Sequence, residues 1–164
     1  MSSHGMSRRL EDLADFFQPK VAAFLAASQA AGYPLRLTRT LTDQTTQAAL
    51  YAVGRRPLTG QETDRLRQEG LFPASQAAPV TNAPDARSTP HGPLWEGKAL
   101  AFDCIPLTPT GAAWWGAPDQ VWRVLYRLAE RHGLDALGDP WGEYLSFDKG
   151  HFAEPGWKIY QALP

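Results

Sequence analysis

The sequence predicts an α+β fold in which a small, mostly antiparallel sheet carries helices packed on one side. Two observations lead to this prediction. Stretches with apolar residues at helical spacing share the chain with short stretches in which apolar and polar residues alternate singly. Loops rich in proline and glycine separate these stretches. The length of 164 residues suits one domain, so we expect a single domain over 1–164, flexible at 1–8, with a long insertion or loop region at 57–97.

The first part of the chain is predicted to hold two helices and a strand. Residues 8–18 place leucine and phenylalanine at helical spacing. Pro19 ends that helix and opens a second one, which stops at Gly32. Leucine alternates with polar residues over 34–39, which indicates a strand.

Two further helices are predicted before the long loop. Thr42 can cap a helix over 43–53. Thr59 and Glu62 have the spacing of a capping box, which predicts a short polar helix to about residue 69. The loop at 71–97 follows, and a loop of this length in a compact domain usually serves function or moves.

The second half is predicted to contain a strand over 98–105 and an amphipathic helix over 117–133. The aromatic stretch 141–161 is strand-like. Asp103 shares a strand face with alanines, which leaves space in front of its carboxylate. An unpaired charge is costly to bury, so this carboxylate needs a partner.

Composition excludes several classes of protein. The chain has 16 Lys and Arg against 17 Asp and Glu, so it has no basic surface that would indicate nucleic-acid binding. The single cysteine, Cys104, excludes an internal disulfide framework and a cysteine-rich zinc finger. No apolar run is long enough to span a bilayer, and the N-terminal residues lack the apolar middle of a secretory signal. We therefore expect a monomer made in the cytoplasm, without membrane insertion.

Two of the four histidines have a metal-binding context. His91 and His151 each lie in a segment rich in glycine or proline, with Asp103 and Asp148 nearby in sequence. Two imidazoles and one carboxylate are a common catalytic zinc set, and they leave a fourth position open for water. On this interpretation His91, Asp103 and His151 are the ligands of Zn²⁺, and Asp148 takes and delivers the proton.

Other interpretations of the same residues stay open. His91 can instead bond a backbone carbonyl while Asp103 pairs with an arginine. Cys104 with His151 would make a cysteine peptidase, although a regular strand points Cys104 away from the face of Asp103. His132 lies in the last turn of a helix, where the dipole favours a cation.

Several segments, in their order, resemble the VanY-type zinc peptidases. They are "TRTLTDQTTQAALYAVGRR", "VTNAPDARSTPH", "ALAFD" and "FDKGHFAEP". This family comprises D-alanyl-D-alanine carboxypeptidases and the L-alanyl-D-glutamate endopeptidases of bacteriophage lysins, and it shares its fold with the hedgehog signalling domain. The resemblance covers about residues 33–155.

The resemblance implies a role for each matching residue. It makes His91, Asp103 and His151 the zinc ligands and Asp148 the general base. Thr89 stands where the family has the serine of Ser-x-His, whose hydroxyl supports the site. An ordinary turn threonine is the alternative.

The sequence departs from the family pattern in three places. Asp103 follows His91 by twelve positions, where the family usually has seven, so "GPLWE" is interpreted as an insertion at the rim of the site with Trp95 available to stack on substrate. An insertion without a role in the site is the alternative. The family glycine of Gly-x-Ala-x-Asp is replaced by Ala99. Aligning "QAALY" puts Thr42 where the family often has an arginine.

An arginine at that place steadies the substrate carbonyl or carboxylate, so its loss bears on activity. Arg39 or Arg55 is expected to substitute for it. The alternative is that the zinc carries more of this load.

The resemblance implies a zinc metallopeptidase that hydrolyses an amide bond in the peptide stem of bacterial peptidoglycan. It favours the L-alanyl-D-glutamate bond and an endolysin of a bacteriophage, made in the host cytoplasm and reaching the cell wall after holin-type release. A D-Ala-D-Ala carboxypeptidase or dipeptidase of the same fold is an alternative. A zinc-bearing wall-binding module without turnover is another.

Overall fold

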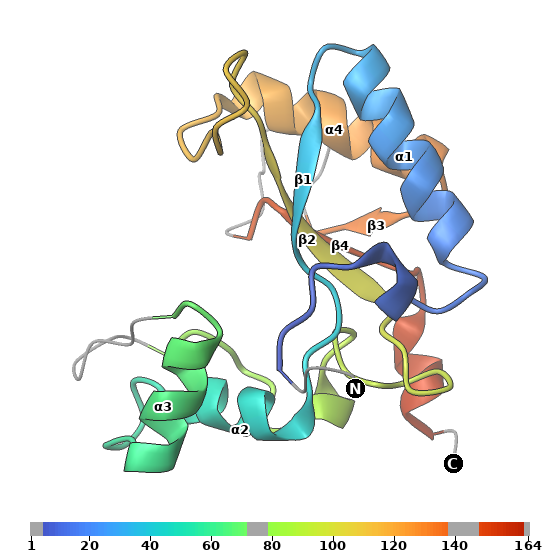
Figure 1. Ribbon diagram of the computed structural model, residues 1–164. Coiled ribbons are helices and arrows are strands. Elements are labelled where there is room, and N and C mark those ends of the chain that lie inside the picture. The colour runs from blue at the N-terminus through green and yellow to red at the C-terminus, as the bar shows by residue number, and fades with distance from the viewer. Residues whose placement is uncertain (1–4, 72–78, 138–147, 163–164) are drawn as a thin grey trace.

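The computed structural model describes residues 5–71, 79–137 and 148–162 and has an α+β architecture (Figure 1). In chain order the elements are η1 (Leu10–Asp12), α1 (Gln18–Ala30), β1 (Leu35–Arg39), α2 (Gln44–Ala52), α3 (Gly60–Gln68), η2 (Ala86–Ser88), β2 (Ala101–Pro106), α4 (Asp119–Arg131), β3 (Asp135–Ala136), β4 (His151–Ala153) and η3 (Trp157–Ala162). The predicted α+β class is therefore confirmed.

Four described strands form one antiparallel sheet in the order β1-β2-β4-β3. The pairing of β2 with β4 sets Phe102 opposite Phe152 and Asp103 opposite His151. Opposite residues in an antiparallel pair share a face of the sheet. The two phenylalanines thus lie on one face and the two polar residues on the other.

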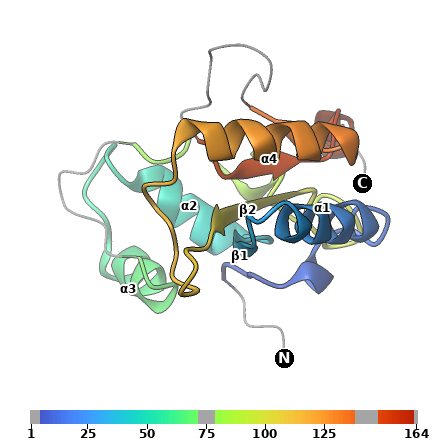
Figure 2. The same cartoon turned by 90° about the horizontal axis from the view of Figure 1, so that it is seen from above.

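Helices α1 and α4 cover the phenylalanine face. Phe24 of α1 lies 5.9 Å from Phe102 and 5.1 Å from Phe152, measured between ring centroids. Tyr126 of α4 lies 5.9 Å from Phe152. Burial of these rings supplies much of the driving force for folding, because apolar area removed from water is the main favourable contribution. The view from above shows both helices lengthwise along the sheet (Figure 2).

A smaller apolar cluster holds α2 and α3 together, through Ala49, Leu50, Val53 and Leu66. In Figure 1 this helix pair lies apart from α1 and α4. The predicted capping box of α3 is confirmed: Thr59 accepts from the amide of Glu62, and Glu62 accepts from the amide of Thr59. Within the described residues, none of the helices is both long and apolar enough to cross a membrane.

Three local predictions are wrong. Before α1 begins at Gln18, the predicted first helix forms only the short turn η1, because the backbone of 12–14 instead pairs with Ala99. Asp43 rather than Thr42 caps α2, since its carboxylate accepts from the amide of Thr46 at 2.8 Å. The described part of the aromatic tail holds just the short strand β4 and then turns into η3.

The start of the chain, predicted to be flexible, is partly fixed. The amide of Ser7 donates to Leu41 O, and the amide of Asp43 donates to Gly5 O. This N-terminal stretch therefore lies along the segment between β1 and α2. Residues 1–4 lie outside the described residues, as does part of the long loop at 72–78.

Candidate metal centre

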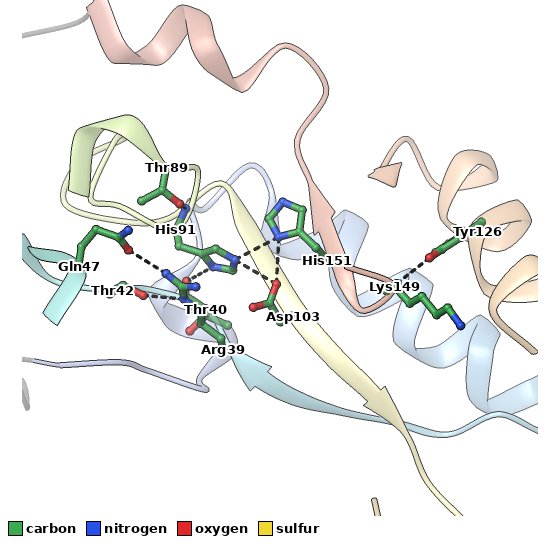
Figure 3. A network of polar contacts seen from close by, with 10 residues as sticks. All are labelled: Arg39, Thr40, Thr42, Gln47, Thr89, His91, Asp103, Tyr126, Lys149 and His151. Carbon is green, nitrogen blue, oxygen red and sulfur yellow. Dashed lines mark hydrogen bonds and ion pairs between the residues drawn. The ribbon is translucent and has the colours of Figure 1, made fainter. Parts of the chain in front are cut away.

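Three side chains from three separate segments meet on the open face of the sheet (Figure 3). His91 Nε2 lies 3.1 Å from Asp103 Oδ1 and 3.3 Å from His151 Nδ1. The third side of this triangle, from His151 Nδ1 to Asp103 Oδ1, is 3.0 Å. The group can bind a metal ion, because ligands bound tetrahedrally to one zinc at about 2.0–2.1 Å lie roughly 3.3 Å apart.

A hydrogen bond to the backbone orients the buried ring of His91. Its Nδ1 lies 2.7 Å from Thr40 O, and a carbonyl oxygen only accepts, so Nδ1 carries the proton. In the neutral ring Nε2 then presents a lone pair toward Asp103 Oδ1. Two acceptors this close repel each other unless a proton or a cation lies between them. A backbone carbonyl on the far nitrogen is also the usual partner of a metal-binding histidine.

The protonation states of His91 and Asp103 favour binding of a cation. Burial, reinforced by the positive charge of Arg39, lowers the pKa of His91 to about 4, so its ring is neutral at pH 7. Burial alone would raise the pKa of Asp103, but the two histidines outweigh it and hold that pKa below its ordinary value. The site therefore offers the lone pair of His91 Nε2 and one negative charge, with Nδ1 of His151 directed at the same point.

A β-bulge turns Arg39 toward this site. The register of β1 against β2 shifts between Leu37 and Arg39, which leaves Thr38 as the extra residue and sets Arg39 opposite Asp103. Without the bulge, strict alternation would point Arg39 to the other face. The sequence indicates the arginine but contains no signal for the bulge that directs it.

Arg39 is held in place by two hydrogen bonds. Its Nε donates to Thr42 Oγ1 at 2.8 Å, and its Nη2 donates to Gln47 Oε1 at 3.0 Å. Thr42, predicted to stand at the family's arginine position, therefore supports an arginine three residues earlier in the chain. Gln47 is fully buried and also donates to Ala83 O at 2.9 Å, which ties α2 to the long loop.

Sequence analysis missed Gln47. A glutamine on the apolar side of an amphipathic helix was the available signal, because a buried amide needs partners.

Asp148 borders the same cavity as His91 and His151, two of the three candidate ligands. This cavity has a volume of about 460 Å³ and is lined by Arg39, His91, Asp148 and His151 together with residues 79–83 and 88–90 of the long loop. Partial burial and the nearby charge of Asp103 raise the pKa of Asp148. A carboxyl group with a raised pKa is better suited to exchange protons near neutral pH.

Two glycines position the histidine segments. A Cβ on Gly150 would lie 2.5 Å from Cys104 O, and the backbone of Gly150 accepts from the Cys104 amide at 3.0 Å. A Cβ on Gly92 would lie 1.5 Å from Ala86 O. Each glycine is therefore required for a close backbone approach next to His91 or His151.

The remaining predicted residues are placed as follows. Thr89 lines the cavity and accepts from the amide of His91 at 3.3 Å, so it supports the loop that carries this ligand. Arg55 stacks on Tyr51 and donates to Tyr51 O, and it is not among the residues that line the cavity. The structure does not bring Trp95 there either, because its ring packs against two aromatic rings, Phe16 and Tyr160.

Cys104 lies on the core face of β2 and is buried. Burial raises the pKa of its thiol well above the ordinary value, so it remains protonated at neutral pH. His151 meanwhile directs Nδ1 at Asp103. These observations argue against a cysteine peptidase that uses this pair.

Comparison with protein-family models found no match for this chain, and comparison with curated proteins found none either.

Proposed function

We propose that this protein is a zinc-dependent peptidase that hydrolyses an amide bond in the peptide stem of bacterial peptidoglycan. The observation that carries the proposal is the triangle of Nε2, Oδ1 and Nδ1 atoms, with sides of 3.0–3.3 Å, at the edge of an open cavity. Two nitrogens and one carboxylate oxygen are a donor set that zinc accepts while keeping a position for water. The order of sequence motifs supports the choice of substrate and a hedgehog-type peptidase fold.

The chain's own residues supply the proton transfer and the electrostatic support. When bound, zinc acts as a Lewis acid that makes water nucleophilic at neutral pH and polarises a carbonyl. Asp148 accepts the proton of the attacking water and passes it to the nitrogen of the leaving amine. Arg39, fixed by Thr42 and Gln47, stabilises the negative charge that develops on the carbonyl oxygen.

We assign the cleaved bond to L-alanine and D-glutamate, with the D-Ala-D-Ala bond as the alternative on the same scaffold. This substrate fits an endolysin of a bacteriophage that reaches the wall after release from the host cytoplasm. The resemblance of the sequence motifs, rather than the geometry of the site, supports these two assignments.

Digestion of defined peptidoglycan tests the proposal. Purified protein is incubated with the polymer with and without 1,10-phenanthroline, and new amino termini are identified by mass spectrometry. We expect new D-glutamate termini that chelation abolishes and added zinc restores. Release of D-alanine instead would show that the protein cleaves the alternative D-Ala-D-Ala bond. Absence of any new terminus from zinc-loaded protein would contradict the peptidase and favour a wall-binding module.

Two variants separate binding of metal from chemistry. Asp148→Asn is expected to retain one zinc per chain by elemental analysis while losing cleavage, because its amide cannot accept the proton. His91→Ala is expected to lose both the zinc and the cleavage. Unchanged turnover by Asp148→Asn would remove Asp148 from the mechanism.

A further inference from the structure

The open face of the sheet continues beyond the metal centre. Arg36 pairs with Ile105 across β1 and β2, and both lie on the side that carries Asp103. Two residues along a strand advance about 7 Å. The row of Arg36 and Ile105 is therefore about two residues of extended peptide away from the row of Asp103 and His151.

Hollows flank this row on both sides. One cavity of about 680 Å³ reaches toward Arg8 and the loop after α3, and another of about 420 Å³ reaches toward Lys149. Both cavities are lined by Asp103, Ile105 and Trp115. The surface next to the metal centre is thus a groove with room for a chain, rather than a closed wall.

Trp115 stands in this groove with 78% of its surface exposed. The loop that carries it is ordered by backbone hydrogen bonds, from the Thr108 amide to Ala112 O at 2.8 Å and from the Trp114 amide to Pro106 O at 2.8 Å. A large aromatic side chain on an ordered loop can bind a ligand at low entropic cost. Its neighbour Trp114 packs against the core, which fixes Trp115 on the outside.

The groove carries positive charge on the side of Arg36 and Arg8, whereas Asp148 and Lys149 line the cavity on its other side. Arg36 donates from Nη2 to Gly111 O at 2.8 Å, and Arg8 donates from Nε to Thr38 O at 3.2 Å. Among the ion pairs of the described residues, no carboxylate is paired with Arg36 or Arg8. The carboxylate of Asp103 is turned to the metal centre. The exposed guanidinium groups therefore favour an anionic ligand.

We infer that this groove is a substrate subsite that selects a carboxylate on the second residue beyond the scissile amide, with Arg36 binding that carboxylate and Trp115 packing on the chain. The inference rests on the proposed function and deepens it. In a stem cut between L-alanine and D-glutamate, the second residue beyond the bond is the third residue of the stem. Meso-diaminopimelate carries an extra side-chain carboxylate at that position, whereas L-lysine carries none.

Binding of two matched tripeptides tests the inference. The probes are L-Ala-γ-D-Glu-meso-diaminopimelate and the same peptide with the side-chain carboxylate amidated. Calorimetry uses the zinc-loaded full chain with Asp148→Asn, so that no cleavage disturbs the titration. We expect the carboxylate to improve the affinity about tenfold, as a charge-assisted pair with arginine would.

Arg36→Gln in the same background should weaken the carboxylate peptide about tenfold and remove the preference between the two peptides. Arg131→Gln is the matched control, because Arg131 is exposed at the far end of α4 and loses the same charge. Equal affinity of both peptides, an unchanged preference in Arg36→Gln, or an equal loss in the control would each overturn the inference. So would failure of both peptides to bind.

Trp115 gives a second, independent readout. Trp115→Ala should weaken both peptides to a similar extent, and Trp115→Phe should restore part of the affinity, because the ring packs on the chain rather than on the carboxylate. Full affinity in Trp115→Ala would remove Trp115 from the subsite. A result that overturns the subsite can be told apart from one that overturns the proposed peptidase activity, because cleavage of peptidoglycan by the unmodified protein is measured separately.

Discussion

At the scale of single residues, Arg39 links the candidate metal centre to the rest of the protein. Its two hydrogen bonds lead to Thr42 and Gln47, and Gln47 in turn holds the loop that lines the cavity. The guanidinium group thus keeps one orientation before substrate arrives. Preorganised donors of this kind avoid the cost of reorientation during the reaction.

Replacing Arg39 by glutamine is expected to lower kcat by about 100-fold, because one donor to the developing oxyanion is lost. Zinc content should stay at one per chain, since Arg39 is not one of the three ligands. Steady-state cleavage and elemental analysis check both statements. Arg55→Gln is the control and should keep nearly full activity, and equal losses in the two variants would contradict the role of Arg39.

The three side chains of the candidate metal centre could be picked out from the sequence, but the residues that hold Arg39 beside them could not. His91, Asp103 and His151 stand out because histidines in loops and a lone carboxylate in an apolar run are unusual. The choice between Arg39 and Arg55 depends on a one-residue bulge, and no residue type announces it. Trp95 was expected at the rim of the site because its segment is an insertion relative to the family spacing, whereas its ring packs against Phe16.

At the scale of elements, the short segment before β4 determines where His151 lies. Gly150→Ala would set a Cβ against Cys104 O, so the segment must move away from β2. We expect the free energy of unfolding to fall by about 1–3 kcal/mol and zinc affinity to fall at least tenfold. Chemical denaturation and zinc titration measure these two effects.

Gly60→Ala is the matched control for Gly150→Ala. A Cβ added to Gly60 would have no other atom within 4 Å, and Gly60 opens a helix. Stability and zinc affinity should remain unchanged there. Normal zinc affinity in Gly150→Ala would show that the close approach to β2 does not position His151.

The ion pair at the start of α3 gives a pH dependence. The hydrogen bond from Arg56 lowers the pKa of Glu62 to about 2, against an ordinary value of 4.5. Between these values the unfolded chain binds the proton first, so the stabilisation is present above pH 4.5 and is lost as the pH falls toward 2. The stability gap between the native chain and Glu62→Gln should therefore narrow over this range in denaturation experiments.

Glu62→Gln is a sharp comparison because glutamine retains an acceptor for the Thr59 amide but carries no charge. A gap that stays constant from about pH 7 to about pH 2.5 would contradict the assigned cause.

The capping box itself could be predicted, since Thr59 and Glu62 have its spacing. The conformation of residues 8–18 could not be predicted, because the backbone partner of this segment, Ala99, is distant in sequence.

At the scale of the whole molecule, the metal centre joins segments that are far apart in the chain. His91, Asp103 and His151 come from a loop, a central strand and a strand near the C-terminus. A cation bound only by the folded chain stabilises it by about 2.7 kcal/mol at a free concentration 100 times Kd. Zinc should therefore raise Tm by several degrees in a scanning calorimeter, and a chelator should reverse the shift.

His151→Ala tests whether this stabilisation comes from the proposed centre. The variant should show the same Tm with and without zinc. A zinc-dependent rise of equal size in His151→Ala would assign the effect to another site on the chain.

The alternation along β2 has a consequence for how this protein can change. Phe102 and Cys104 face the two covering helices, while Asp103 and Ile105 face the groove. Neighbouring positions of this strand are therefore under different constraints, one set from packing of the core and the other from the proposed subsite. Mutant libraries confined to positions 102 and 104 of this strand are expected to change thermal stability, while libraries at 36, 105 and 115 are expected to change what the proposed subsite binds.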